Sequence, residues 1–136
     1  MRLLLFHARR FAWTPDSGVS EAAVEAPDPG EAEGAIVAFC HAEAADAEAP
    51  GKVVTKTIKN VKWLAGKFDC KRVVLHSFGH LGGDSAPGEA ARELLVAAAR
   101  RLEEAGYETQ ITPFGWTHAF QLHADGPGLA KVWKSF

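Results

Sequence analysis

Two stretches of this sequence place chemically versatile side chains beside glycine, where a ligand can approach the backbone closely. The first is Ser77-Phe78-Gly79-His80, and Leu81-Gly82-Gly83-Asp84 follows it directly. The second is the aromatic run Phe114-Gly115-Trp116-Thr117-His118. Histidine exchanges protons near neutral pH, and serine attacks carbonyl carbons when a nearby base accepts its proton. The two stretches are therefore candidate sites for chemistry, and His80 and His118 are their side chains that could exchange a proton.

Other interpretations of these residues stay open at this level. Ser77, His80 and Asp84 together suggest a serine hydrolase, although a catalytic triad is recognised by geometry and not by closeness in sequence. Without a function, His80 would cap a turn and His118 would lie on a solvated strand face. Among the six histidines only His76 and His80 show the paired spacing of a zinc motif, but four residues apart in a strand they lie too far apart for one ion. No complete nucleotide-binding loop is present. We therefore expect neither a metal nor a cofactor.

The composition bounds the class of protein. A chain of 136 residues with 47% hydrophobic and 24% charged residues is typical of one globular domain, which we expect to span residues 1–136. No apolar run approaches the roughly 20 residues of a membrane helix, so we expect a cytoplasmic protein without membrane contact. Cys40 and Cys70 are far apart, and we expect two free, buried thiols.

A formal net charge of −2 gives no overall attraction toward nucleic acid. Any contact with RNA must therefore be local. The candidates are the segment from Lys52 to Lys67, which holds five lysines, and the pair Lys71-Arg72. Lysines on a helix are also common on a face that merely contacts solvent.

The elements that must position these residues follow from hydrophobic periodicity. Short apolar runs predict strands, and apolar residues at steps of three and four predict helices. The segment 14–34 is polar and rich in proline and glycine, which predicts a long loop that carries one edge strand. Residues 129–134 are predicted to form a helical turn that docks through Leu129, Val132 and Trp133. The predicted strands cover 2–7, 35–42, 73–78, 108–113 and 118–123, and the predicted helices run from Pro50 to Phe68 and from Pro87 to Gly106.

This order of elements predicts an α/β fold with parallel connections around the two helices. Ligands bind such sheets where the strands end. The segment from Ser77 to Asp84 follows a predicted central strand and is therefore the first place to expect a site.

Four stretches, in order and at similar spacing, resemble the amino-terminal editing domain of archaeal-type threonyl-tRNA synthetase. Residues 2–7 resemble its first strand and residues 37–39 its second. Ser77-Phe78-Gly79-His80-Leu81 resembles its aromatic-small-His-Leu turn. Residues 112–120, Thr-Pro-Phe-Gly-Trp-Thr-His-Ala-Phe, resemble its Pro-Phe-Gly-aromatic loop. The last two matches are the more specific, and the four together span nearly the whole chain.

The resemblance implies a D-aminoacyl-tRNA deacylase-like α/β fold, with mixed β-sheets and two main helices, that assembles as a homodimer. It implies hydrolysis of the ester of mischarged tRNA, above all seryl-tRNA for threonine, at the 3′ end. Because the sequence stops soon after the matched region, we expect a free-standing editor, working beside a threonyl-tRNA synthetase that lacks its own editing domain. The alternatives are a non-catalytic module that binds tRNA or a synthetase, and a hydrolase of small esters or amides.

The resemblance also implies roles for individual residues. His80 would face the bound ester, and Trp116 would stack on the terminal adenine. His118 and Thr117 stand where the archaeal loop carries Lys and Tyr, and Lys131 stands where the family has an acidic residue. The catalytic candidates are thus His80 and His118, and the substrate-binding candidates are Ala42, Ser77, Phe78, Gly79, Phe114, Trp116 and Thr117.

Overall fold

One long strand, β1 (Arg2–Gly18), organises the sheet in the computed structural model, which describes all 136 residues. On one edge β1 pairs antiparallel with β2 (Gly30–His41). The parallel strands β3 (Arg72–Ser77) and β4 (Glu108–Ile111) then extend the sheet from β2. Each parallel pair is joined by a helix, as the order of elements predicts.

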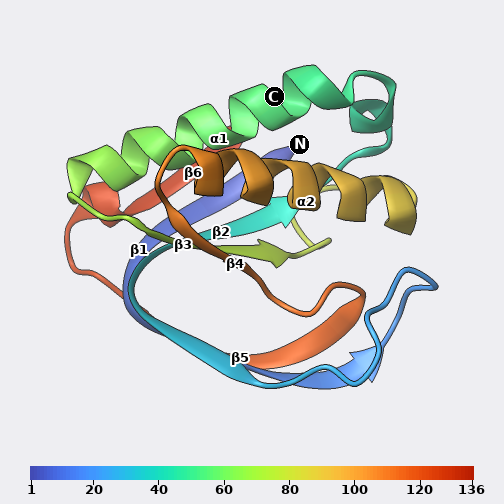
Figure 1. The fold of residues 1–136 in the computed structure, drawn as a ribbon, viewed down its shortest axis with the longest axis horizontal. Coiled ribbons are helices and arrows are strands. Elements are labelled where there is room, and N and C mark those ends of the chain that lie inside the picture. Colours follow the sequence, from blue (N-terminus) through green and yellow to red (C-terminus); the bar gives the residue numbers. More distant parts are fainter.

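The other edge of β1 is shared by two strands. Its first part pairs with β6 (Lys131–Ser135) and its later part with β5 (Trp116–Ala124). The register with β5 shifts at two points, one of them at Pro15, which has no N–H to donate to a ladder. Figure 1 shows how the later part of β1 and the beginning of β2, together with β5, curve away from the helices.

Two helices cover one face of the sheet, α1 (Pro50–Lys67) and α2 (Gly88–Glu104) (Figure 1). Short 3-10 turns lie at Ala44–Glu48 and Gly128–Ala130. Apolar residues such as Val61 and Leu64 of α1 and Leu102 of α2 are buried against Leu3 and Ile36 of the sheet. Neither helix combines the length and apolar character that crossing a membrane requires.

Aromatic rings fill the concave side formed by the curling of the sheet. The ring of Phe39 lies 5.0 Å from that of His76 and 5.8 Å from that of Phe11. Phe120 of β5 closes the cluster, 5.4 Å from Phe39. Edge-on and tilted contacts of this kind are favourable for aromatic pairs. The cluster forms the inner wall below the strand ends.

The structure confirms both helices, their parallel connections and two free, buried cysteines. Two predictions about irregular segments were wrong. The loop predicted over 14–34 was too long, because β1 continues to Gly18 and β2 already begins at Gly30, which leaves 19–29 between the two strands. The pairing of this part of β1 with β5, about a hundred residues later, stabilises the extension in spite of Pro15.

The predicted helical turn over 129–134 was also wrong. After Gly128–Ala130 the chain becomes strand β6, which pairs with the edge of β1 that would otherwise stay open. Of the side chains expected to dock, Val132 packs against the core, whereas Leu129 and Trp133 are exposed. Alternation along a strand explains why neighbours such as Val132 and Trp133 face opposite sides.

Candidate functional site

A cavity of about 260 Å³ lies at the carboxyl ends of β2 and β3. Its walls come from the segment that follows β3, the start of α2, the connection between β4 and β5, and Val19-Ser20 after β1. The structure brings every site residue expected from the sequence to this cavity: Ala42, Ser77, Phe78, Gly79, His80, Phe114, Trp116, Thr117 and His118.

Residues 112–115, which connect β4 to β5, make this convergence possible. The two strands are close in sequence but lie at opposite ends of the sheet order, so the connection spans the open end of the sheet. Gly115 has φ +82°, and a Cβ atom there would lie 2.5 Å from Cα of Ala23. Only glycine combines that backbone conformation with such a close approach. The connection is thereby pressed against the segment that follows β1.

Hydrogen bonds fasten the same contact. The amide of Val19 donates to the carbonyl of Gly115 at 2.8 Å, and that of Val24 donates to the carbonyl of Phe114 at 3.1 Å. The indole Nε1 of Trp116 donates to the carbonyl of Val24 at 2.8 Å. The polar edge of Trp116 is therefore engaged within the protein, and its ring plane is what a ligand would meet.

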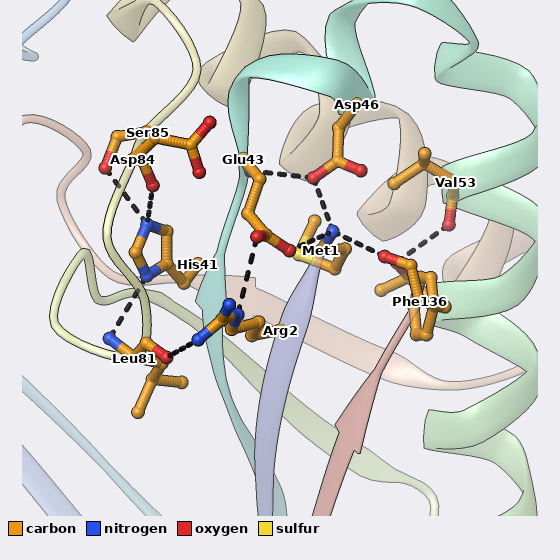
Figure 2. Close-up of polar contacts among 11 residues, drawn as sticks. Met1, Arg2, His41, Glu43, Asp46, Val53, Leu81, Asp84, Ser85 and Phe136 are labelled. Atoms are coloured by element: carbon orange, nitrogen blue, oxygen red, sulfur yellow. Dashed lines mark hydrogen bonds and ion pairs between the residues drawn. The ribbon is translucent and has the colours of Figure 1, made fainter.

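His41 anchors the opposite wall, a role that the sequence analysis did not assign. Its ring is buried, with Nε2 2.6 Å from the carbonyl oxygen of Asp84 and 3.0 Å from Oγ of Ser85 (Figure 2). Nδ1 accepts the amide proton of Leu81 at 3.1 Å. Because an amide N–H can only donate, Nδ1 is unprotonated and Nε2 carries the proton. One side chain thus fixes both ends of the segment 81–85.

Arg2 holds this segment from the other side. Its Nη1 donates to the carbonyl of Leu81 at 2.8 Å, and its Nε lies 3.4 Å from Oε2 of Glu43 (Figure 2). Oε1 of Glu43 in turn contacts the amino group of Met1 at 3.0 Å, and Asp46 contacts the same group at 2.6 Å. The wall is therefore tied to the beginning of β1 and to the residues that follow β2.

Two histidines meet on the inner side of the cavity. His76 of β3 is buried and lies with Nδ1 2.9 Å from Oγ1 of Thr112. The ring of His118 from β5 lies 5.4 Å away. Burial, with a smaller contribution from the neighbouring His118, lowers the pKa of His76 to about 3. Burial also lowers the pKa of His118. Both imidazoles are therefore neutral at neutral pH.

His118 differs from His76 in one respect. Neither of its ring nitrogens makes a well-formed hydrogen bond within the chain, although both are shielded from the surface, and the backbone of Trp116 only partly offsets the lowering of its pKa by burial. Buried polar atoms are nearly always paired, and an exception calls for an explanation such as a catalytic role or a bound water or ion. His118 is therefore the side chain in this cavity best placed to act on a bound ligand.

The remaining candidates differ in their availability. His80 lies exposed at the mouth, with its ring edge-on to Phe78 at 4.9 Å. Ser77 makes no hydrogen bond to a histidine or to Asp84, so the structure contains no Ser-His-Asp relay. Cys40 also lines the cavity, but burial raises the pKa of its thiol to about 12. A thiol held in this form is a poor nucleophile.

Backbone amides provide further donors. The N–H groups of Gly79 and His80 make no hydrogen bond within the chain, and both residues line the cavity. The carbonyl of Ala42, by contrast, accepts the amide of Ala86 at 2.9 Å. No group of three or more metal-ligating side chains converges anywhere in the chain. The site thus offers a neutral imidazole, two free amides and apolar walls.

Comparison with known proteins places this arrangement in a family. The threonine–tRNA ligase of Methanopyrus kandleri is 32% identical over 133 residues, which are 97% of this chain and 21% of the ligase. That of Methanosphaerula palustris is 32% identical over 137 residues, 99% of this chain and 22% of the ligase. The chain therefore spans about a fifth of the length of the curated ligases that it matches.

A solved structure supports the fold. The c-Myc DNA Unwinding Element Binding Protein superposes with a TM-score of 0.64 over 100% of this chain and 99% of its own, at 12% identity. This likeness confirms the expected D-aminoacyl-tRNA deacylase-like α/β fold. The family model described as the archaea-specific editing domain of threonyl-tRNA synthetase matches residues 1–136. The chain belongs to the family of archaeal-type threonyl-tRNA synthetase editing domains.

Proposed function

We propose that this chain is a free-standing editing hydrolase that removes serine wrongly esterified to the tRNA for threonine. The observation that carries the proposal is the meeting of the two family-like stretches, 77–81 and 112–120, around one cavity. Family membership supports editing of tRNA in general.

The chemistry suits a site with few ionisable groups. Water attacks the ester carbonyl carbon, the bond from that carbon to the ribose oxygen breaks, and the ribose oxygen takes up a proton. The products are free amino acid and uncharged tRNA. An aminoacyl ester is labile, so orienting the water and polarising the carbonyl are sufficient tasks, and the terminal ribose 2′-hydroxyl would assist, as the family resemblance implies.

Each available group has a role in this proposal. The neutral ring of His118 orients the attacking water and accepts its proton through a free ring nitrogen. The amides of Gly79 and His80 donate to the carbonyl oxygen as negative charge develops on it. His80, at the mouth, contacts the amino acid or the ribose. The ring plane of Trp116 stacks on the terminal adenine.

Deacylation assays test the proposal. Seryl-tRNA and threonyl-tRNA carrying the threonine anticodon are incubated with the protein, and the fraction still esterified is followed. Selective loss of serine is expected. His118→Ala should lower the rate about 100-fold or more, the usual contribution of a general base. His123→Ala is the matched control, because His123 lies exposed five residues along the same strand, on its other side.

Three outcomes would contradict the proposal. Well-folded protein that leaves mischarged and D-aminoacyl-tRNAs intact has no such activity. Tight binding of tRNA without turnover indicates a binding module. Cleavage of small esters without RNA, at a rate that tRNA does not improve, indicates a different hydrolase.

We also propose that two copies of the chain form a homodimer and that it serves a threonyl-tRNA synthetase lacking its own editing domain. The family resemblance supports both partners. Light scattering should then give twice the chain mass of 14.6 kDa. Serine should accumulate on the tRNA when such a synthetase works alone and disappear when this protein is added. A monomeric mass, or no effect on serine, would contradict the respective part.

A further inference from the structure

Helix α1 carries a charge that the rest of the chain does not share. Its 18 residues include five lysines and no carboxylate, although the chain as a whole has a formal net charge of −2. All five lysines are exposed, and none of them forms an ion pair. Among the lysines and arginines, only arginines pair with carboxylates, such as Arg10 with Glu31 at 2.6 Å. The positive charge of α1 therefore stays uncompensated.

Most of this charge lies along one side of the helix. Lys52, Lys56, Lys59 and Trp63 follow at steps of four, three and four residues, which places them in one row, and Lys67 continues it. We call these four lysines, together with Trp63, the lysine stripe. At about 1.5 Å per residue, the helix that carries them is about 27 Å long. The stripe is thus long enough to contact several phosphates of one nucleic-acid strand.

An exposed indole lies within the stripe. Trp63 is 42% exposed, with Nζ of Lys67 5.7 Å and Nζ of Lys134 5.4 Å from its ring centre. Lys56 likewise lies with Nζ 5.9 Å from the ring of Phe136. Attraction between an ammonium group and an aromatic face fixes these cations in place without neutralising them. The arrangement concentrates positive charge on this surface, where α1 passes the end of the chain.

The stripe begins at the end of the molecule that holds the cavity. Ala42, which lines the cavity, is followed by the 3-10 turn Ala44–Glu48, and α1 begins directly after it at Pro50. Figure 1 shows α1 starting where β2 ends and running back along the sheet. A nucleic acid with its end in the cavity could therefore lie along α1.

We propose that the lysine stripe binds the phosphate backbone of the tRNA whose 3′ end enters the cavity. This inference rests on the proposed function for the identity of the RNA. The unpaired ammonium groups favour phosphate as the ligand, because their binding to a nucleic-acid strand releases the counterions condensed along it. The stripe thereby supplies the local attraction that a chain with net negative charge otherwise lacks.

The salt dependence of tRNA binding tests the inference. Binding of uncharged, fluorescently labelled tRNA to the whole chain is measured by anisotropy over a series of KCl concentrations. One variant combines Lys52→Gln, Lys56→Gln and Lys59→Gln. The matched control combines Arg9→Gln, Arg10→Gln and Arg92→Gln, which removes equal charge from exposed arginines that are already paired with carboxylates. Circular dichroism checks that both variants are folded.

The expected result is a change confined to the stripe. Each lost duplex phosphate contact lowers the slope of log Kd against log salt by about 0.9, so the lysine variant should lose about 2 to 3 units of slope. At about 0.1 M salt each such contact corresponds to roughly eightfold in Kd. The arginine variant should keep the wild-type slope.

The outcomes separate this inference from the proposed function. Equal slopes for the two variants would overturn the inference, and so would wild-type protein that does not bind tRNA. If the lysine variant keeps the wild-type slope, the lysine stripe does not bind tRNA, and an acidic protein surface becomes its candidate partner. If the wild type binds tRNA through the stripe but removes no amino acid, the stripe stands and the proposed hydrolase fails. If it deacylates seryl-tRNA and the lysine variant has an unchanged KM, only the stripe fails.

Discussion

Acid should destabilise this protein through His76, and the size of the effect follows from its surroundings. Burial lowers its pKa from 6.5 to about 3. Between these two values the unfolded chain binds a proton that the folded chain does not, so stability falls as the pH falls below 6.5. At about pH 5 the drop is 1.5 pH units at about 1.4 kcal/mol each, or about 2 kcal/mol relative to pH 8.

The variant His76→Phe isolates this contribution. Phenylalanine fits the aromatic surroundings, where the rings of Phe39 and Phe120 lie 5.0 and 5.7 Å from that of His76, although Thr112 loses its partner. Urea unfolding at about pH 8 and pH 5 gives four free energies of unfolding. The loss on acidification should be about 2 kcal/mol smaller in the variant. Parallel losses in both proteins would refute the reasoning, because His76 would then titrate equally in the folded and unfolded chains.

Three further predictions concern the walls of the cavity. Gly115→Ala should lower the free energy of unfolding by about 1–3 kcal/mol, because of the positive φ and the clash with Ala23. Gly126→Ala, with open space around it, should leave the stability unchanged, and thermal unfolding compares the two variants. Cys40 should resist iodoacetamide at about pH 8 in native protein and react in urea, as mass spectrometry would detect, because burial raises its thiol pKa to about 12. His41→Phe removes three hydrogen-bond contacts worth about 1 kcal/mol each, so it should lower the melting temperature by roughly 10 °C. It should also speed the hydrogen exchange of the backbone amides over 81–85. An unchanged exchange rate would contradict the anchoring role of His41.

Periodic segments of this sequence predicted their structures well. The apolar steps in α1 and α2 and the continuous apolar strands β2 and β3 depend on neighbours in sequence and on burial alone. The course of β1 beyond Trp13 and the strand β6 depend instead on pairing between distant residues. No local pattern announces such partners, and Pro15 argues against a strand at that position. The irregular segments were therefore the ones predicted wrongly.

The site shows a similar division. His80 and His118 could be selected because each lies in a glycine-containing stretch of recognisable type. His41 was missed, although it ends a predicted strand beside Ala42, as His80 follows one. Its partners, Leu81, Asp84 and Ser85, become evident only once the segment after β3 is folded against β2. The neutral pair of His76 and His118 likewise depends on burial that sequence does not specify.

The shared edge of β1 also constrains the order in which this protein can be made. Its 17 residues are synthesised about a hundred residues before β5 and β6, which lie within residues 116–135 and pair with one entire edge of β1. Contacts at such separation slow folding, and an unpaired strand edge is a template for aggregation. During synthesis this edge of β1 therefore stays unpaired until residues 116–135 have been made. Chaperones that shield strand edges would act in this interval, and truncation before residue 116 should yield aggregation and not a smaller folded core.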